Sequence, residues 1–202
     1  MEKIFQNIKQ LVERELSCSA HDMEHTLRVY NLCLKLSEGE NVDLDVLKAS
    51  ALLHDIGRVN EDNDSTGKTD HALLSAEMAE EILNEINFPF SKIQHVKDCI
   101  VSHRYRTGIT PETIEAKILF DADKLDTLGA IGVARCYVWV GRNNAKIYRK
   151  MNPEEYAKEN LGGTIKGRIK DKTKHSPQIE YETKIKHLVD KLHTSKAKET
   201  FS

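Results

Sequence analysis

The sequence lacks any apolar run long enough to cross a bilayer, which takes about 20 residues. The first 16 residues alternate charged and apolar side chains and do not form the apolar stretch of a secretory signal. The formal net charge is only −2, so the whole molecule has no general attraction for nucleic acid or for an anionic membrane. We therefore expect a cytoplasmic protein without membrane or nucleic-acid partners. An anionic ligand would need a local cluster of cations or a metal.

Cysteine is scarce, and strand-like alternation, internal repeats and low-complexity tracts are absent. The four cysteines form no C-x-x-C pair, and Cys33, Cys99 and Cys136 lie in apolar helical patterns, where buried, reduced thiols are expected. A chain of 202 residues with 39% hydrophobic and 31% charged side chains can bury a sizeable core. We expect an all-α protein with one domain over residues 1–202.

What the sequence does contain is helical periodicity. Apolar side chains recur at intervals of three and four residues, and Asp43 and Asp70 are expected helix N-caps. Residues 61–70 and 151–178 are rich in turn-forming residues and are predicted loops. The apolar residues after Asp121 predict a long buried helix, although Gly129 and Gly132 count against its continuity. The predicted helices cover residues 2–17, 22–38, 43–57, segments beginning near 70 and 90, 112–121 and 179–198.

Metal-ligand side chains fall in phase with these apolar stripes. His25 precedes Val29 at helical spacing, His54 extends the stripe of the third helix, and His103 extends that of the fifth. Asp123 lies on an inward-facing stripe of the sixth helix. Four separate helices are thus expected to direct such side chains into one interior.

A single histidine at the end of an apolar stripe is more often a buried structural residue than a ligand. An inward carboxylate such as Asp123 is costly to bury without a partner, and Asp55 adds a second one beside His54. A shared cation would offset the desolvation of both carboxylates. The group as a whole therefore favours a metal site.

Five sequence blocks in this order resemble the HD superfamily of metal-dependent phosphohydrolases. They are SAHDMEHTLRVYNLCLKL, ALLHDIGR, HALLSAEMAEEIL, IVSHR and DADKLDTLGAIGVAR, and they lie within residues 19–135. They are most similar to small bacterial HD-domain hydrolases of the nucleotide pyrophosphohydrolase type. The resemblance implies an HD-type helical bundle with the metal site in its interior.

The resemblance further implies that His25, His54, Asp55 and Asp123 hold one divalent cation. Two imidazoles and two carboxylates suit Mn²⁺, Fe²⁺, Co²⁺ or Ni²⁺, and Mg²⁺ is a further alternative. Such a cation would activate a water molecule for in-line attack on phosphorus. Asp55 is therefore assigned to the catalytic residues as well as to the ligands.

His71 and His103 leave the number of metals open. By resemblance to multi-metal members they could complete a second site bridged by Asp55, although we expect one metal. They could instead bind phosphate or serve as the general acid. Glu61, in the predicted 61–70 loop, could orient the attacking water, and His21 could support the site from the helix start. A plain solvated connector is the alternative for this loop.

Substrate contacts are predicted near the motif residues. Developing charge on the phosphoryl oxygens requires nearby cations. Lys124 stands where arginine is usual in the family, which affects phosphate contacts because lysine and arginine differ in geometry. Asp126, one turn after Asp123, could contact substrate or orient a ligand, or could simply face solvent. The candidate cations are Lys124, Arg28, Arg58 and Arg104.

We therefore expect a phosphohydrolase that acts on a nucleotide or a similar small phosphorylated compound. One alternative is a cyclic-nucleotide phosphodiesterase with a binuclear centre. Another is a non-catalytic, metal-stabilised nucleotide-binding module. Tyr137 and Trp139 could pair with a second copy of the chain, so a homodimer is left open.

Overall fold

The computed structural model describes residues 1–16, 23–64, 66–105, 108–165, 167 and 169–201. Within these ranges every regular element is a helix, so the all-α prediction is confirmed. None of these helices is long and apolar enough to cross a membrane.

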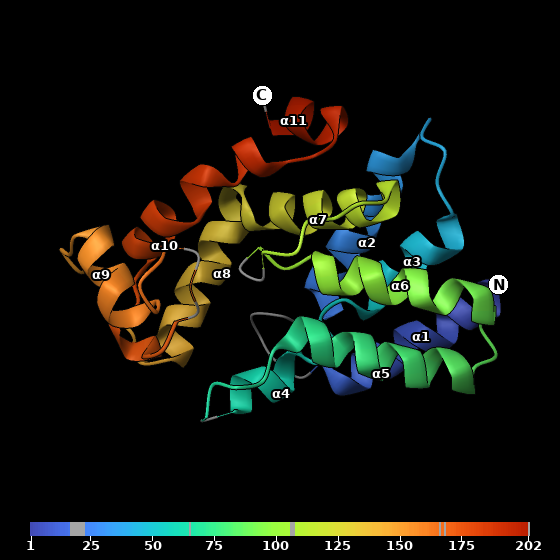
Figure 1. Cartoon of the computed structure of the whole chain (residues 1–202), viewed down its shortest axis with the longest axis horizontal. Helices are drawn as coiled ribbons and strands as arrows, with labels where there is room; N and C mark the ends of the chain where they lie inside the picture. Colours follow the sequence, from blue (N-terminus) through green and yellow to red (C-terminus); the bar gives the residue numbers. More distant parts are fainter. Residues whose placement is uncertain (17–22, 65, 106–107, 166, 168, 202) are drawn as a thin grey trace.

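The N-terminal two-thirds of the chain form a helical bundle around the main core (Figure 1). Helix α5 packs against α6, α2 against α7, and α3 contacts both α2 and α6. Side chains of α3 from Val46 to Leu53 are almost all buried, which places this short apolar helix at the centre of the bundle. The bundle helices are α1 (Glu2–Glu15), α2 (Met23–Ser37), α3 (Leu44–Leu53), α4 (Arg58–Asn63), α5 (His71–Glu85), α6 (Phe90–Ser102) and α7 (Ile114–Thr127).

Both predicted N-caps are present. The Asp43 carboxylate accepts hydrogen bonds from the backbone N–H groups of Asp45 and Val46, and the Asp70 carboxylate accepts one from Ala72. Such caps satisfy donors that the first helical turn leaves without partners. They fix where α3 and α5 begin, and therefore the positions of histidines at the ends of these helices.

Helix boundaries near the site differ from the prediction, since the third helix ends at Leu53 rather than at residue 57. The predicted 61–70 loop begins inside a helix, because α4 (Arg58–Asn63) continues three residues into it. The sixth helix, predicted from residue 112, begins at Ile114, because the Thr113 side chain caps it by accepting from the backbone N–H of Ala116. The starts of α4 and α7 depend on local hydrogen bonds, which the spacing of apolar side chains does not show.

The apolar residues after Asp121 are helical as predicted, but the helix is interrupted and its second part is largely exposed. The chain leaves helical geometry at Leu128, and Gly129 has a φ of +79°, a conformation that favours glycine. A separate helix, α8 (Gly129–Arg142), then runs from the bundle towards the C-terminal elements (Figure 1). Most of its apolar side chains are exposed, and Cys136 is only half-buried rather than buried as predicted.

The C-terminal third contains more helix than predicted, but not the single helix expected over residues 179–198. Helices α9 (Pro153–Asn160) and α10 (Pro177–Thr183) form a second, small core around Tyr156 and Ile179. The helical spacing of residues 181–192 breaks at Lys184, whose ψ is −63° at a φ of −139°. The chain must leave the helix here because Ile179 belongs to the second core, whereas Leu192 is buried in the main core.

The last helix, α11 (Ser195–Phe201), is attached to the bundle by one buried carboxylate. Asp121 of α7, fully buried, accepts hydrogen bonds from the backbone N–H of His193 at 2.8 Å and from the N–H and hydroxyl of Thr194, both at 2.7 Å. This single side chain satisfies the backbone donors of the segment that enters α11.

We expect Asp121→Ala to lower the free energy of unfolding by about 3 kcal/mol, because buried donors would lose a charged acceptor. Urea denaturation measures this loss. Asp190→Ala, at an exposed carboxylate of the same C-terminal segment, is the matched control and should change stability by less than about 0.5 kcal/mol. Equal stability of the two variants would contradict the anchoring role.

Candidate metal centre

Four histidines from four helical elements meet inside the bundle. His25 lies on α2, His54 directly follows α3, His71 is the first residue of α5, and His103 directly follows α6. All four are at least 96% buried. The predicted convergence of metal-ligand side chains is thus present, and three of the four histidines stand at helix ends.

Asp55 lies at the centre of this cluster. Its Oδ2 atom is 3.6 Å from Nε2 of His25 and 3.8 Å from Nε2 of His54. Its Oδ1 atom is 3.3 Å from Nε2 of His71 and 3.6 Å from Nε2 of His103. Each carboxylate oxygen therefore faces two imidazole nitrogens, and Asp55 belongs to two separate groups that could hold a metal ion.

The first group contains the predicted ligands His25, His54 and Asp55. The two Nε2 atoms are 3.4 Å apart, and Oδ1 of Asp123 lies 3.5 Å from Nε2 of His25. Ligand atoms that share a cation at about 2.1 Å are separated by roughly 3.0 to 3.4 Å at right or tetrahedral angles. The four residues fit a divalent cation with only small adjustments.

In each of the four histidines, Nδ1 already contacts a polar group of the protein. Nδ1 of His54 is 2.8 Å from the carbonyl of Ala51, and Nδ1 of His103 is 2.5 Å from the carbonyl of Ile100. A carbonyl oxygen only accepts, so these Nδ1 atoms carry the proton and Nε2 keeps its lone pair. This is the tautomer that a metal ligand needs, and it is fixed by the last turn of each helix.

Asp126 holds His25 in the corresponding orientation. Its Oδ2 atom lies 2.7 Å from Nδ1 of His25 and also accepts from Nη1 of Arg135 at 2.6 Å. Arg28 donates through Nε to Oδ1 at 2.6 Å. Burial opposes its ionisation, but the His25 and Arg28 hydrogen bonds lower the pKa of Asp126 to about 2. Of the readings that the sequence left open, the geometry matches the orientation of a ligand.

Glu61 contacts the second group of possible metal ligands, which consists of Asp55, His71 and His103. Its Oε2 atom lies 2.7 Å from Nδ1 of His71 and 2.9 Å from Nη1 of Arg58. Its Oε1 atom pairs with Nη1 of Arg104 at 2.9 Å, and the same nitrogen is 2.8 Å from the carboxylate of Asp70. Burial opposes ionisation of Glu61, yet His71 and the two arginines hold its pKa well below the usual range.

Lys124 is buried and faces the centre of the site. Its Nζ donates to the carbonyl of His103 at 2.8 Å and to the carboxylate of Asp123. Burial lowers the pKa of Lys124, while the adjacent Asp123 opposes that shift. The lysine therefore links the carboxylate of Asp123 on α7 to the end of α6.

Burial favours the neutral form of two of the imidazoles, whereas the neighbouring histidines favour the charged form of Asp55. Burial lowers the pKa of His54 to about 4 and, together with the charge of Arg58, lowers that of His71 to about 3. Burial would raise the pKa of Asp55, but the surrounding histidines hold it well below its ordinary value. Neutral nitrogen donors next to carboxylates are the donor set that divalent transition metals prefer.

These shifts make the stability of the metal-free protein depend on pH. Below pH 6.5 the unfolded chain protonates His54 and His71, whereas the folded protein keeps them neutral, so stability is lost as the pH falls. We expect a loss of about 1 to 2 kcal/mol per histidine between pH 6.5 and 5. The raised pKa of His25 acts in the opposite sense, but only above pH 6.5.

Urea denaturation of chelator-treated protein at pH 7.5, 6.5 and 5 measures this dependence. His54→Gln removes one of the two titrating imidazoles, so the free energy of unfolding should depend less steeply on pH. A pH-independent free energy of unfolding over this range would contradict neutral burial of the two rings.

The cluster opens into a cavity of about 850 Å³. Asp55, Glu61, His71, His103, Asp123 and Lys124 line its inner part, together with Arg58 and Arg104. Residues of α8 and of the segment 169–185 line the opposite part. The cavity thus lies between the helical bundle and the C-terminal elements, and a ligand in it would touch both.

Sequence reasoning missed Arg135 and the cavity-lining residues Glu180, Lys184 and Ile185. Arg135 lies on α8, whose direction relative to α7 depends on the break at Gly129, and no spacing rule relates it to Asp126. His21, considered as a supporting residue, lies outside the described residues.

Comparison with known families and structures gives a consistent result. A family model described as HD domain matches residues 22–128, more than half of the chain. The Bacillus subtilis protein YpgQ, itself described as uncharacterized, is 30% identical over 138 residues, which cover 64% of this chain and 62% of YpgQ. The match thus spans less than two-thirds of that relative's length.

Solved structures share the fold. The crystal structure of YpgQ in complex with ADP covers 98% of this chain and 86% of its own, with a TM-score of 0.69 at 24% identity. A predicted HD superfamily hydrolase from an uncultured Thermotogales bacterium is 35% identical, with a TM-score of 0.55. That match covers 69% of this chain and 75% of the other.

Proposed function

This chain belongs to the HD domain family, and from that premise we propose that it is a divalent-metal-dependent phosphohydrolase acting on a nucleotide or a similar small phosphorylated compound. The observation that carries the proposal is the position of Asp55, whose two oxygens face four imidazole nitrogens at the inner part of a large cavity. A buried carboxylate in this setting is suited to hold a cation and to keep it in reach of a ligand.

We assign the cation to His25, His54, Asp55 and Asp123. When bound there, a divalent metal would supply an activated water and would polarise a phosphoryl oxygen. Mn²⁺, Fe²⁺, Co²⁺ and Ni²⁺ suit the nitrogen and oxygen donors better than Mg²⁺, which prefers oxygen alone. Asp126 positions His25, because it fixes the ring nitrogen that faces away from the cation.

Cations of the chain would receive the phosphate group. Lys124 lines the cavity beside Asp123, and Arg58 and Arg104 line it beside His71. Such fixed positive groups stabilise charge that develops on equatorial phosphoryl oxygens. Arg28 serves a different purpose in this proposal, since its guanidinium contacts Asp126 and supports the ligand His25.

His71 and His103 remain candidates for proton transfer to the leaving oxygen. A neutral imidazole can accept a proton or relay one between water and substrate at a distance suited to hydrogen bonding. Glu61 would position His71 through the 2.7 Å contact with Nδ1, whereas the sequence left open a direct action of Glu61 on water.

A second candidate function is a phosphodiesterase with a binuclear centre. The observation that favours it is the second group, formed by Asp55, His71 and His103. Asp55 would then belong to the residues that hold each of two cations. One tightly bound metal per chain, measured by elemental analysis of the purified protein, would exclude this candidate.

The experiment that tests the main proposal is a substrate screen with the full chain and Mn²⁺. Nucleoside mono-, di- and triphosphates and cyclic nucleotides are incubated with the protein, and released phosphate and pyrophosphate are measured separately. The proposal expects release from at least one compound that stops on chelation. Binding of nucleotides without turnover would instead identify a metal-stabilised binding module.

A further inference from the structure

Helix α8 presents one face to the cavity. Its lining residues are Gly132, Arg135, Cys136, Trp139 and Asn143, spaced as successive turns of one helical face. Arg135 contacts Asp126, the carboxylate that orients His25, so this end of the face lies next to the metal cluster. Trp139 lies one turn further on, about 6 Å along the helix axis.

Trp139 is the chain's single tryptophan, and its ring contacts one buried histidine. His175 packs edge-on against it, with ring centroids 5.3 Å apart at an interplanar angle of 82°. His175 is 2% exposed, lies 2.8 Å from the Tyr156 hydroxyl through Nδ1, and lies 3.0 Å from the Glu180 carboxylate through Nε2.

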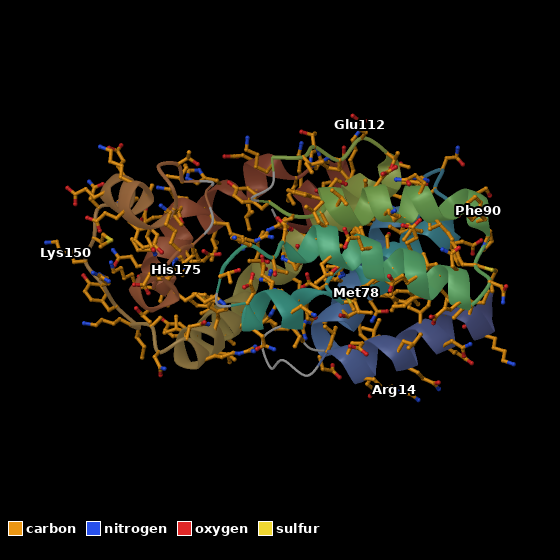
Figure 2. The ribbon with its side chains drawn as sticks, turned by 60° about the horizontal axis from the view of Figure 1, so that its bottom comes forward. Arg14, Met78, Phe90, Glu112, Lys150 and His175 are labelled. Carbon is orange, nitrogen blue, oxygen red and sulfur yellow. The ribbon has the colours of Figure 1, made fainter. Side chains whose placement is uncertain are left out.

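This support connects the tryptophan to the second core. Asn160 donates to the Tyr156 hydroxyl at 2.7 Å, and Tyr156 is fully buried among the side chains of that core. Figure 2 shows His175 within the C-terminal part of the molecule, well inside the outer end marked by Lys150. The aromatic surface is therefore fixed by a buried hydrogen-bonded network rather than by a surface loop.

The two parts of the cavity differ in chemistry. The part beside the metal cluster is lined by charged groups, among them Arg58, Arg104 and Lys124. The part beside Trp139 contains the apolar side chains of Ile169 and Ile185 together with charged side chains of the same segment, such as Lys170 and Glu180. A ligand that fits both parts has an anionic end and a flat aromatic face.

We propose that Trp139 is the base-binding platform of this cavity, on which the aromatic base of a nucleotide stacks while its phosphates lie at the metal cluster. This inference rests on the proposed function and identifies the nucleoside part of its substrate. The volume of about 850 Å³ is within the range that encloses a ligand of this size. Stacking accepts every base, so the platform discriminates nucleotides from simple phosphates rather than one base from another.

Fluorescence of the single tryptophan tests the contact directly. The metal-loaded full chain is titrated with α,β-methylene-ADP, which is not hydrolysed between its phosphorus atoms, and separately with methylene diphosphonate, which lacks the nucleoside. The platform predicts saturable quenching by the nucleotide analogue and none by the diphosphonate. Binding of the nucleotide analogue, detected by calorimetry, without any change in fluorescence would overturn the inference.

Variants separate stacking from folding. Because base–aromatic stacking contributes about 1 to 3 kcal/mol, Trp139→Ala should weaken binding of α,β-methylene-ADP by about 5- to 150-fold. Trp139→Phe should restore binding to within about threefold. Tyr137→Ala, at an exposed aromatic residue of the same helix outside the cavity lining, is the matched control. Equal weakening of nucleotide and diphosphonate binding in Trp139→Ala would indicate a structural role and overturn the platform.

The outcomes distinguish this inference from the proposed function. In one outcome no nucleotide is hydrolysed, but the analogue quenches the fluorescence of Trp139 and binds more weakly to Trp139→Ala. The hydrolase assignment then fails and the platform stands. If hydrolysis is metal-dependent and the ratio of KM values for a nucleotide and tripolyphosphate is the same in wild type and Trp139→Ala, the platform fails and the hydrolase stands.

Discussion

Replacing Asp55 with alanine is expected to lower metal-dependent hydrolysis by on the order of 10³-fold or more and to remove bound metal from the protein. Asp55 is the one side chain shared by both candidate metal groups, and each of its oxygens faces two histidines. Losing it removes an anionic ligand and leaves the neutral imidazoles without the charge that attracts a cation. Initial rates on the best substrate of the screen and metal content by elemental analysis measure the two effects.

Asp55→Asn and Asp98→Ala make this result specific. The asparagine variant keeps the shape of the side chain but lacks its charge, so we expect the same loss of metal with an unchanged circular dichroism spectrum. Asp98 is an exposed carboxylate on α6, and its removal should leave activity and metal content within twofold of wild type. Retained metal-dependent activity in both Asp55 variants would refute the proposed function.

The helices of the bundle and their inward-facing polar residues could be predicted because both depend on local sequence. Asp43 and Asp70 cap helices through contacts within three residues, and His25 and His54 share the phase of the apolar side chains beside them. The family resemblance then assigned these residues to one cation. Prediction succeeded where the determining contacts lie within one or two helical turns.

The C-terminal third could not be predicted because its structure depends on contacts between distant segments. Apolar residues at helical spacing indicate one long helix only if they share one core, and Ile179 and Leu192 are buried in different cores. Helix α8 carries apolar side chains on several faces, and the sequence does not say which face meets the cavity. The break at Gly129 decides that question by placing Arg135 and Trp139 in the lining of the cavity.

The same limit explains why the role of Asp126 was left open. Its sequence position is compatible with a solvated carboxylate, but in the fold it contacts a histidine of α2 and arginines from α2 and α8. Side chains from α2, distant in the chain, and from the following helix α8 meet on this one carboxylate. The packing of α7 against both helices makes Asp126 a buried partner of His25.

We expect Asp126→Asn to weaken metal binding by about 10- to 100-fold. The carboxylate lies 2.7 Å from Nδ1 of His25, which keeps the lone pair on Nε2, and it is paired with Arg28 and Arg135. An amide lacks this charge, and its NH₂ group would face a donor, so His25 loses both its fixed orientation and its electrostatic support. Titration of the chelator-treated protein with Mn²⁺, followed by activity and by calorimetry, measures the affinity.

A supporting role and a direct substrate contact give different results at high metal concentration. If Asp126 acts through His25, saturating Mn²⁺ should return kcat to within a few-fold of wild type while KM for substrate stays unchanged. Glu24→Gln, an exposed carboxylate next to His25, removes the same charge without touching the ring and should leave metal affinity unaltered. A variant that binds Mn²⁺ normally but has a raised KM would place Asp126 in contact with the substrate instead, since orientation of a ligand cannot change substrate affinity while leaving the metal site intact.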